Sequence, residues 1–134
     1  MVGIVIVSHK NLAETLIDTA ASIMGHQDDI TSVAFFPHEN LEHLRERIVV
    51  AIKKVDSENG VIVFTDLLGG SCCNACAEIL DNERVVIITG LNLAMVLDVM
   101  VHRRLSNLQE VANLAKLAGI KSIKNLKETI ATNE

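Results

Sequence analysis

The sequence predicts an α/β fold: a single domain with a mostly parallel four-stranded sheet and helices on both faces. Three observations support this prediction. Four short segments are continuously apolar, helical patterns alternate with them, and the 134-residue chain contains no repeat and no linker. Continuously apolar strands are typical of sheets covered on both faces, and this alternation gives parallel strands with right-handed crossovers. We expect one domain over residues 1–124 and a polar C-terminal tail over residues 125–134.

The four expected strands are rich in Val and Ile and stop at polar or glycine-containing segments. They cover residues 2–7, 30–36, 60–66 and 84–89. The common order for such a unit is 2-1-3-4, which puts a topological switch point between the first and third strands. Residues 120–123, which contain two Ile, could add a short antiparallel strand at the C-terminal end.

Five helices are expected between and after the strands. Apolar stripes at helical spacing mark the first two: Leu12, Leu16, Ala20, Ile23 and Met24, then Leu41, Leu44, Ile48, Ile52 and Val55. The third helix begins near Ser71, and the fourth follows Asn92, a good N-cap residue. The fifth opens with the capping-box pattern at residues 106–109, in which Ser106 is the cap, and ends at Gly119.

Composition and charge argue against several classes of function. The formal net charge is −5, Trp and Tyr are absent, and the only aromatic residues are three Phe. Nucleic-acid binding depends on a basic surface and often on aromatic stacking, so we expect no nucleic-acid partner. No apolar run approaches the roughly 20 residues of a membrane span. Three cysteines within five residues do not suit a disulfide framework, which favours a cytoplasmic location.

Two polar residues stand at the ends of expected strands. His9 follows the first strand, and Asp66 ends the third. Because parallel strands end at one edge of the sheet, the switch point makes these side chains neighbours across a crevice. A carboxylate beside an imidazole holds one ring N–H, leaves the other nitrogen free and stabilises positive charge on the ring. We expect His9 and Asp66 to be the catalytic pair.

A glycine-rich turn follows this carboxylate and suits a phosphoryl group. Gly69 and Gly70 let the backbone approach a ligand closely, and Ser71 opens a helix and offers a hydroxyl donor. The start of a helix adds unpaired N–H groups and a partial positive charge. We expect Gly69, Gly70 and Ser71 to bind phosphate beside a histidine that receives and passes on a phosphoryl group.

Plainer interpretations of these residues stay open. A histidine at a strand end is more often structural, and strand-to-helix turns need glycine in any case. Cys73 and Cys76 form a C-x-x-C pattern at a helix start, which could be a redox pair or, with His9, a metal site. We expect instead that these thiols pack the helix against the sheet, so we expect no metal site and no cofactor.

Three blocks of sequence, in this order, carry a family resemblance. They read Gly-Ile-Val-Ile-Val-Ser-His at 3–9, Gly-Val-Ile-Val-Phe-Thr-Asp-Leu-Leu-Gly-Gly-Ser at 60–71 and Ile-Thr-Gly-Leu-Asn-Leu-Ala-Met at 88–95. Over nearly its whole length the chain resembles the enzyme IIA component of the mannose/fructose/sorbose family of the bacterial phosphoenolpyruvate-dependent sugar phosphotransferase system.

The resemblance implies a role for each site residue. His9 matches the phosphorylated histidine, Asp66 the acidic residue beside it, and Ser71 the serine of a Gly-Gly-Ser-Pro turn near the phosphate. Such proteins accept a phosphoryl group from the carrier HPr and pass it to a IIB subunit for sugar phosphorylation and uptake. The resemblance also implies a homodimer whose C-terminal segment reaches the other subunit, and membrane contact only indirectly, through permease subunits.

The chain departs from the family pattern beside its site residues. Lys10 stands where Gly is usual, and Cys72 and Cys73 stand where Pro-Phe is usual. These changes leave the chemistry in place and bear on the partners and the sugar. The same fold could also serve as a regulatory phosphohistidine module without transport, or as the phosphoryl-donor subunit of a dihydroxyacetone kinase. A redox or metal-binding protein is the third class.

Overall fold

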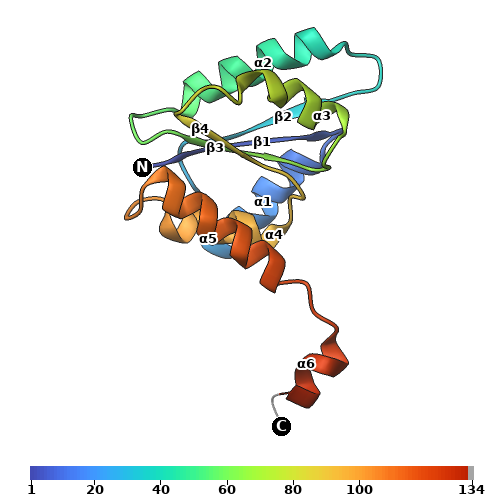
Figure 1. Ribbon diagram of the computed structural model, residues 1–134, viewed down its shortest axis with the longest axis vertical. Coiled ribbons are helices and arrows are strands. Elements are labelled where there is room, and N and C mark those ends of the chain that lie inside the picture. Colours follow the sequence, from blue (N-terminus) through green and yellow to red (C-terminus); the bar gives the residue numbers. More distant parts are fainter. Residues whose placement is uncertain (133–134) are drawn as a thin grey trace.

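Four parallel strands form the centre of the molecule in the order β2-β1-β3-β4. The computed structural model describes residues 1–132 (Figure 1). The strands are β1 Gly3–His9, β2 Ile30–Phe35, β3 Val61–Thr65 and β4 Val85–Ile88. His9 pairs with Phe35 and Val7 with Thr65, so β1 and β2 end level and β3 ends two residues earlier at the same edge of the sheet. The predicted parallel sheet and its strand order are confirmed.

Helices cover both faces of this sheet (Figure 1). One layer contains α2 Leu41–Val55 and α3 Ser71–Cys76, which continues into the 3₁₀ turn η1 Ala77–Ile79. The other layer contains α1 Leu12–Met24, α4 Leu93–His102 and α5 Leu108–Lys121. A last helix, α6 Leu126–Thr132, lies apart from both layers (Figure 1). Among residues 1–132, no helix has the length and apolar character needed to cross a bilayer.

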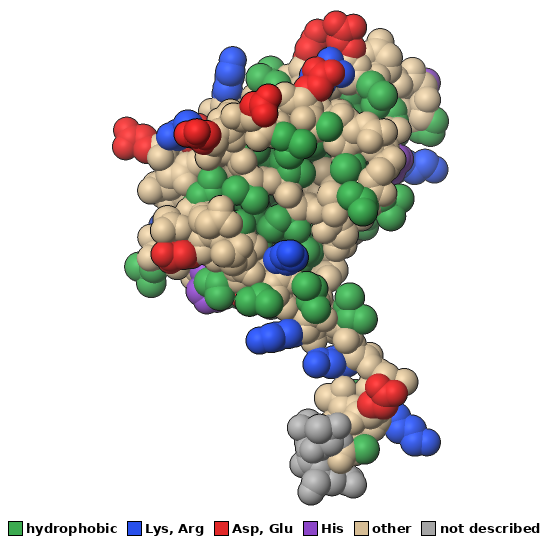
Figure 2. All heavy atoms as spheres, viewed as in Figure 1, with side chains coloured by type: hydrophobic (Ala, Val, Ile, Leu, Met, Phe, Trp, Pro, Cys, Tyr) green, Lys and Arg blue, Asp and Glu red, His purple; other side chains and the backbone are tan. Residues whose placement is uncertain are grey.

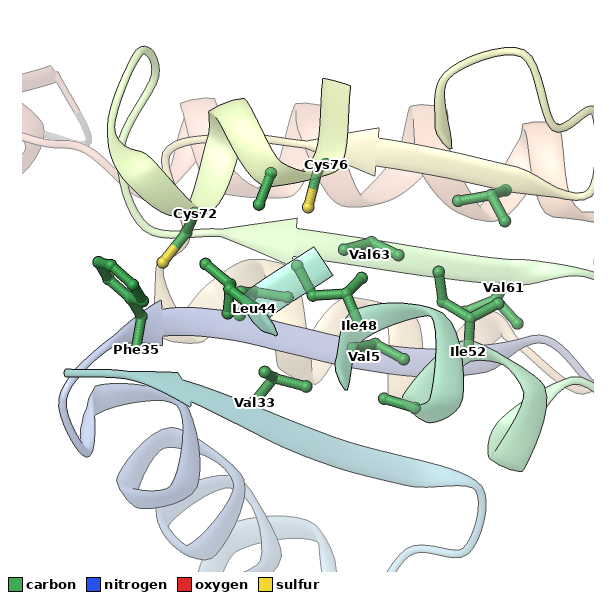
Figure 3. Packing of buried hydrophobic residues seen from close by; sticks show 14 of the residues in the cluster. Val5, Val33, Phe35, Leu44, Ile48, Ile52, Val61, Val63, Cys72 and Cys76 are labelled. Atoms are coloured by element: carbon green, nitrogen blue, oxygen red, sulfur yellow. The ribbon is translucent and has the colours of Figure 1, made fainter. Parts of the chain in front are cut away.

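Alternation along the strands decides which way each side chain points. Val5, Val7 and Val63 belong to the core beneath α2 and α3, whereas Ile6 and Phe64 belong to the core beneath α1, α4 and α5. Figure 3 shows the first of these cores, with Val5 and Val63 facing the helix that carries Leu44, Ile48 and Ile52. His9 follows Val5 and Val7 with the same parity, so its ring points toward the side of α3.

Side chains of Asn cap α2, α4, α5 and, through Asn125, α6. Asn40 accepts a hydrogen bond from the His43 N–H at 2.7 Å, Asn92 from Met95 at 3.1 Å, and Asn107 from Glu110 at 2.9 Å. The expected cap at Asn92 is confirmed. The expected cap at Ser106 is wrong by one residue, because the Asn107 side chain captures the free N–H of the first turn instead.

The buried face of α1 differs from the predicted stripe. Ala13 and Ala20 are fully buried, whereas Leu12, Ile23 and Met24 are exposed. The helix presents small residues to the sheet, which brings it close to β1 and β2. An apolar stripe at helical spacing therefore identified the helix but not the face that packs.

The C-terminal segment differs most from expectation. Helix α5 continues through Gly119 to Lys121, so residues 120 and 121 are helical, and no fifth strand is present among residues 1–132. A Cβ on Gly119 would lie 2.6 Å from Cγ of Met95, so this glycine permits close packing of α5 on α4 and does not end the helix. The expected polar tail contains α6, and its residues 133–134 lie outside the described part of the chain.

Candidate functional site

His9 and Asp66 are brought together at the carboxyl ends of β1 and β3. One carboxylate oxygen, Oδ2 of Asp66, accepts hydrogen bonds from the backbone N–H of His9 and from its ring Nδ1, each at 2.8 Å. The topology of the sheet predicts this pairing, because the switch point separates these two strands. The structure therefore supplies the imidazole–carboxylate pair on which the sequence-based hypothesis rests.

Asp66 is held by more than the histidine ring. Its second oxygen, Oδ1, accepts the backbone N–H of Leu67 at 2.9 Å. Partial burial tends to raise the pKa of the Asp66 carboxyl, but the hydrogen bonds from His9 and Leu67 and the charge of the imidazole outweigh it. The pKa of this carboxyl therefore lies below its ordinary value, and at neutral pH the group is an anion that can only accept hydrogen bonds.

This anion determines which nitrogen of His9 is free. Because the carboxylate accepts only, Nδ1 must carry a proton, and in the neutral ring Nε2 keeps its lone pair. The His9 side chain is 42% exposed, whereas that of Asp66 is 9% exposed. The ring also packs against Phe35 in a T-shaped arrangement, with centroids 5.9 Å apart and planes at 79°. The imidazole is thus oriented on two sides and open to solvent on a third.

Ser8 fixes the turn after β1, a role that its place at the end of an apolar strand does not indicate by itself. The Ser8 hydroxyl is fully buried, accepts the Ala13 N–H at 2.7 Å and donates to the carbonyl of His9 at 3.2 Å. Lys10 adopts a left-handed φ of 49°, and its N–H donates to the Phe35 carbonyl at 2.8 Å. The sequence signal that could have predicted this hydrogen bond is a hydroxyl residue a few positions before the start of a helix.

The glycine-rich turn lies on the other side of the ring. Gly69 has a φ of +79°, which favours glycine, whereas Gly70 is the N-cap of α3 with an ordinary φ of −77°. A Cβ on Gly70 would lie 3.4 Å from Cε1 of His9, so the turn closely flanks the imidazole. A pocket of about 460 Å³ opens there, and its lining residues are His9, Lys10, Phe35, Pro37 and Ser71.

The structure brings a different cysteine to the histidine from those of the C-x-x-C pattern. The Sγ atom of Cys72 lies 4.0 Å from Nδ1 of His9, whereas Cys76 points into the core near Val63 (Figure 3). Burial raises the pKa of both thiols to about 12, with the charge of Asp66 also acting on Cys72. All three cysteines are free thiols. A C-x-x-C site that includes His9 is therefore not formed.

Comparisons with known proteins identify the family to which the chain belongs. The family model described as "PTS system fructose IIA component" matches residues 3–116. The chain is 34% identical over 128 residues to the PTS system mannose-specific EIIAB component of Escherichia coli (strain K12), covering 94% of this chain and 40% of that protein. It is 31% identical over 132 residues to the PTS system sorbose-specific EIIA component of Lacticaseibacillus casei, covering 97% and 94%.

A solved structure gives the same result for the fold. The crystal structure of phosphotransferase system component EIIA from Streptococcus agalactiae matches with a TM-score of 0.87, covering 96% of this chain and 99% of that one at 20% identity. The chain spans about two fifths of the length of the EIIAB relative but nearly the whole length of the sorbose-specific one. The chain belongs to the mannose/fructose/sorbose family of PTS enzyme IIA components, which are phosphotransferase subunits.

Proposed function

We propose that this protein is a phosphocarrier that accepts a phosphoryl group on His9 from phospho-HPr and passes it to a IIB subunit for sugar phosphorylation and uptake. The main observation behind the proposal is the hydrogen bond between Nδ1 of His9 and Oδ2 of Asp66, which leaves Nε2 free at an open pocket. We further propose that the protein acts in the cytoplasm and meets the membrane only through permease subunits.

The transfer needs no net proton exchange. The Nε2 lone pair attacks the phosphorus atom, the P–N bond to the donor histidine breaks, and that nitrogen recovers its electron pair. The ring of His9 then holds both the phosphoryl group and the Nδ1 proton, so positive charge develops on it. Asp66 stabilises that charge through its 2.8 Å hydrogen bond. Transfer to IIB reverses these steps.

Ser71 and the glycine turn have a supporting role in this proposal. Ser71 lines the same pocket as His9, so its hydroxyl can donate to a phosphoryl oxygen on Nε2. Gly70 keeps a side chain away from the space beside the ring, which a phosphoryl group must enter, and Gly69 supplies the left-handed turn that places Gly70 there. Lys10 also lines the pocket and supplies a positive charge for an incoming phosphoryl group.

Intact mass measurement tests the proposal directly. The protein is incubated with phosphoenolpyruvate, enzyme I and HPr, and we expect the addition of one phosphoryl group. The adduct should be labile in acid and stable in base, as a phosphoramidate is, and His9→Ala should abolish it. An acid-stable adduct, or one that persists in His9→Ala, would show that another residue is the acceptor. Discharge of the adduct by a IIB subunit then tests the second half-reaction.

We also propose that the protein is a homodimer. Three features support this. β4 is an edge strand, and a groove of about 420 Å³ beside it is lined in part by apolar residues of β4 and α5. Figure 2 shows hydrophobic side chains gathered on the face that carries these elements. The C-terminal segment exposes Ile123, Leu126 and Ile130 and lies apart from its own domain. Light scattering that gives one chain mass at all concentrations would contradict the dimer.

A further inference from the structure

Three metal-ligating groups of different kinds converge beneath the His9 ring. Nδ1 of His9 lies 2.8 Å from Oδ2 of Asp66 and 4.0 Å from Sγ of Cys72. One ligand atom from each of the three residues lies within 4.8 Å of the other two. The residues come from the end of β1, the loop after β3 and the first turn of α3. A nitrogen, an oxygen and a sulfur ligand form a donor set that suits Zn²⁺.

The spacing of these atoms is close to that around a tetrahedral zinc ion. Bond lengths of about 2.0–2.1 Å to nitrogen and oxygen and about 2.3 Å to sulfur place neighbouring ligand atoms about 3.3 Å (N···O) and 3.6 Å (N···S) apart. The observed separations of 2.8 Å and 4.0 Å lie on either side of these values. To seat the ion, the N···O separation must widen by about 0.5 Å and the N···S separation must shorten by about 0.4 Å. We expect rotation of the side chains to supply changes of this size.

The surroundings hold two of the ligands and leave the third accessible. Cys72 is fully buried in the core beneath α2 and α3, and the backbone N–H groups of His9 and Leu67 fix the Asp66 carboxylate. The His9 side chain is 42% exposed and lines the pocket, so we expect movement of this ring to admit an ion to the cluster, where a water molecule completes the four-coordinate shell. The site is therefore preorganised on the protein side.

We propose that His9, Asp66 and Cys72 form a Zn²⁺ site whose occupation blocks phosphoryl acceptance. The metal-binding part stands on the geometry alone, whereas the blocking effect rests on the proposed phosphocarrier function. Bonds form from Zn²⁺ to Nδ1, Oδ2 and Sγ. The Cys72 thiol releases its proton to solvent, and the ring proton moves from Nδ1 to Nε2 through water.

The shift of the ring proton explains the block. With the metal on Nδ1, the neutral imidazole carries its proton on Nε2, so the lone pair that should attack phosphorus is no longer available. Zinc also takes the Asp66 oxygen that would stabilise positive charge on the ring. A single ion thus removes both features on which the transfer depends, and removing the ion restores them.

The direct test is metal binding by the full-length protein, using Co²⁺ as a spectroscopic probe and Zn²⁺ in competition with a chromophoric chelator. We expect one Co²⁺ per chain, with a thiolate-to-cobalt charge-transfer band that Zn²⁺ abolishes. Cys72→Ser and Cys72→Ala should lose this band and weaken Zn²⁺ binding by more than the roughly 10- to 100-fold that loss of an outer-shell partner costs. Cys73→Ser is the matched control, because Cys73 is the adjacent thiol and lies outside the cluster.

Phosphoryl acceptance is then measured with and without Zn²⁺, with each variant compared with its own metal-free rate. We expect Zn²⁺ to inhibit the wild type and Cys73→Ser reversibly, and to leave the Cys72 variants insensitive. Thermal unfolding shows whether each variant is folded. Absent Co²⁺ binding, or equal binding by the Cys72 variants, overturns the site. Binding through Cys72 in a protein that accepts no phosphoryl group even without metal overturns the proposed function instead and leaves the site standing.

Discussion

The two ends of the sheet use buried polar groups in opposite ways. At the amino end, Arg103 is 1% exposed, and its terminal nitrogens donate to the carbonyls of Asp28 and Asp29 and to the side chain of Gln27. At the carboxyl end, Nδ1 of His9 is hydrogen-bonded to Asp66, and Nε2 is open to a pocket. Arg103 thus joins segments of the chain, whereas His9 keeps one atom available for reaction.

This difference separates stability from function. A buried polar group whose terminal atoms are nearly all paired stabilises the fold, and removal of it leaves unpaired carbonyls behind. A group with one free atom contributes less to the fold and can take part in chemistry. Substitutions at the amino end are therefore expected to lower stability, and those at the carboxyl end to lower the transfer rate.

The largest effect is expected for Asp66→Asn. The amide is nearly the same shape, so the fold should persist, but it no longer carries the charge that stabilises the phosphorylated ring. We expect phosphoryl transfer to slow by roughly 10²–10⁴-fold, the range for loss of acid–base or electrostatic assistance. Rapid-quench measurement of transfer from phospho-HPr checks this, and a rate equal to the wild type would show that the pair is not functionally coupled.

Arg103→Met is expected to have the opposite effect. Methionine fills a similar volume but leaves the carbonyls of Asp28 and Asp29 without their donor, so the unfolding free energy should fall by about 2–4 kcal/mol. Arg104→Met, at the exposed neighbour, should stay within about 0.5 kcal/mol. Urea unfolding measures both. A slower transfer rate in folded Arg103→Met would mean that the two ends of the sheet are coupled.

How far the sequence predicts these features depends on how local their causes are. The pairing of His9 with Asp66 follows from two strand ends and a parallel sheet, so it is predictable. The position of Cys72 depends on the direction in which α3 leaves the turn that contains the left-handed Gly69. The spacing of apolar residues does not predict that direction. Gly119 has the sequence pattern of a helix end, but the glycine is needed for close contact with Met95 of another helix. Such a tertiary contact leaves no signal in the local sequence.

The two glycines of the turn after Asp66 should separate backbone strain from site geometry. Gly69→Ala places a Cβ on a residue with a φ of +79°, at a cost of about 1–2 kcal/mol in unfolding free energy. Gly70→Ala is free of that strain, but its methyl group would lie 3.4 Å from Cε1 of His9 and should slow transfer by up to roughly 10²-fold. Chemical unfolding and transfer rates on both variants check this, and the reverse pattern would contradict it.

Acid should affect the wild type more than the Asp66→Asn variant. The folded pKa of Asp66 lies below its ordinary value of 3.8, so the carboxylate contributes stability that is complete above that value. This contribution is lost as the pH falls through the folded pKa. Unfolding free energies measured downward from pH 5 should therefore decline more steeply for the wild type. Parallel curves would show that the contacts of the carboxylate add nothing to stability.

The smallest effect concerns two fully buried hydroxyl groups near the site. The Oγ1 atom of Thr65 has no hydrogen-bond partner among the described residues, whereas Ser8 pairs with the Ala13 N–H at 2.7 Å. Thr65→Val removes an unpaired polar atom at nearly constant shape, so we expect the unfolding free energy to rise by up to about 1 kcal/mol. Ser8→Ala removes a hydroxyl that is hydrogen-bonded, so the unfolding free energy should fall by about 1 kcal/mol. Thermal and urea unfolding measure both changes. A loss of stability in Thr65→Val would mean that its hydroxyl has a partner in solution, such as an ordered water.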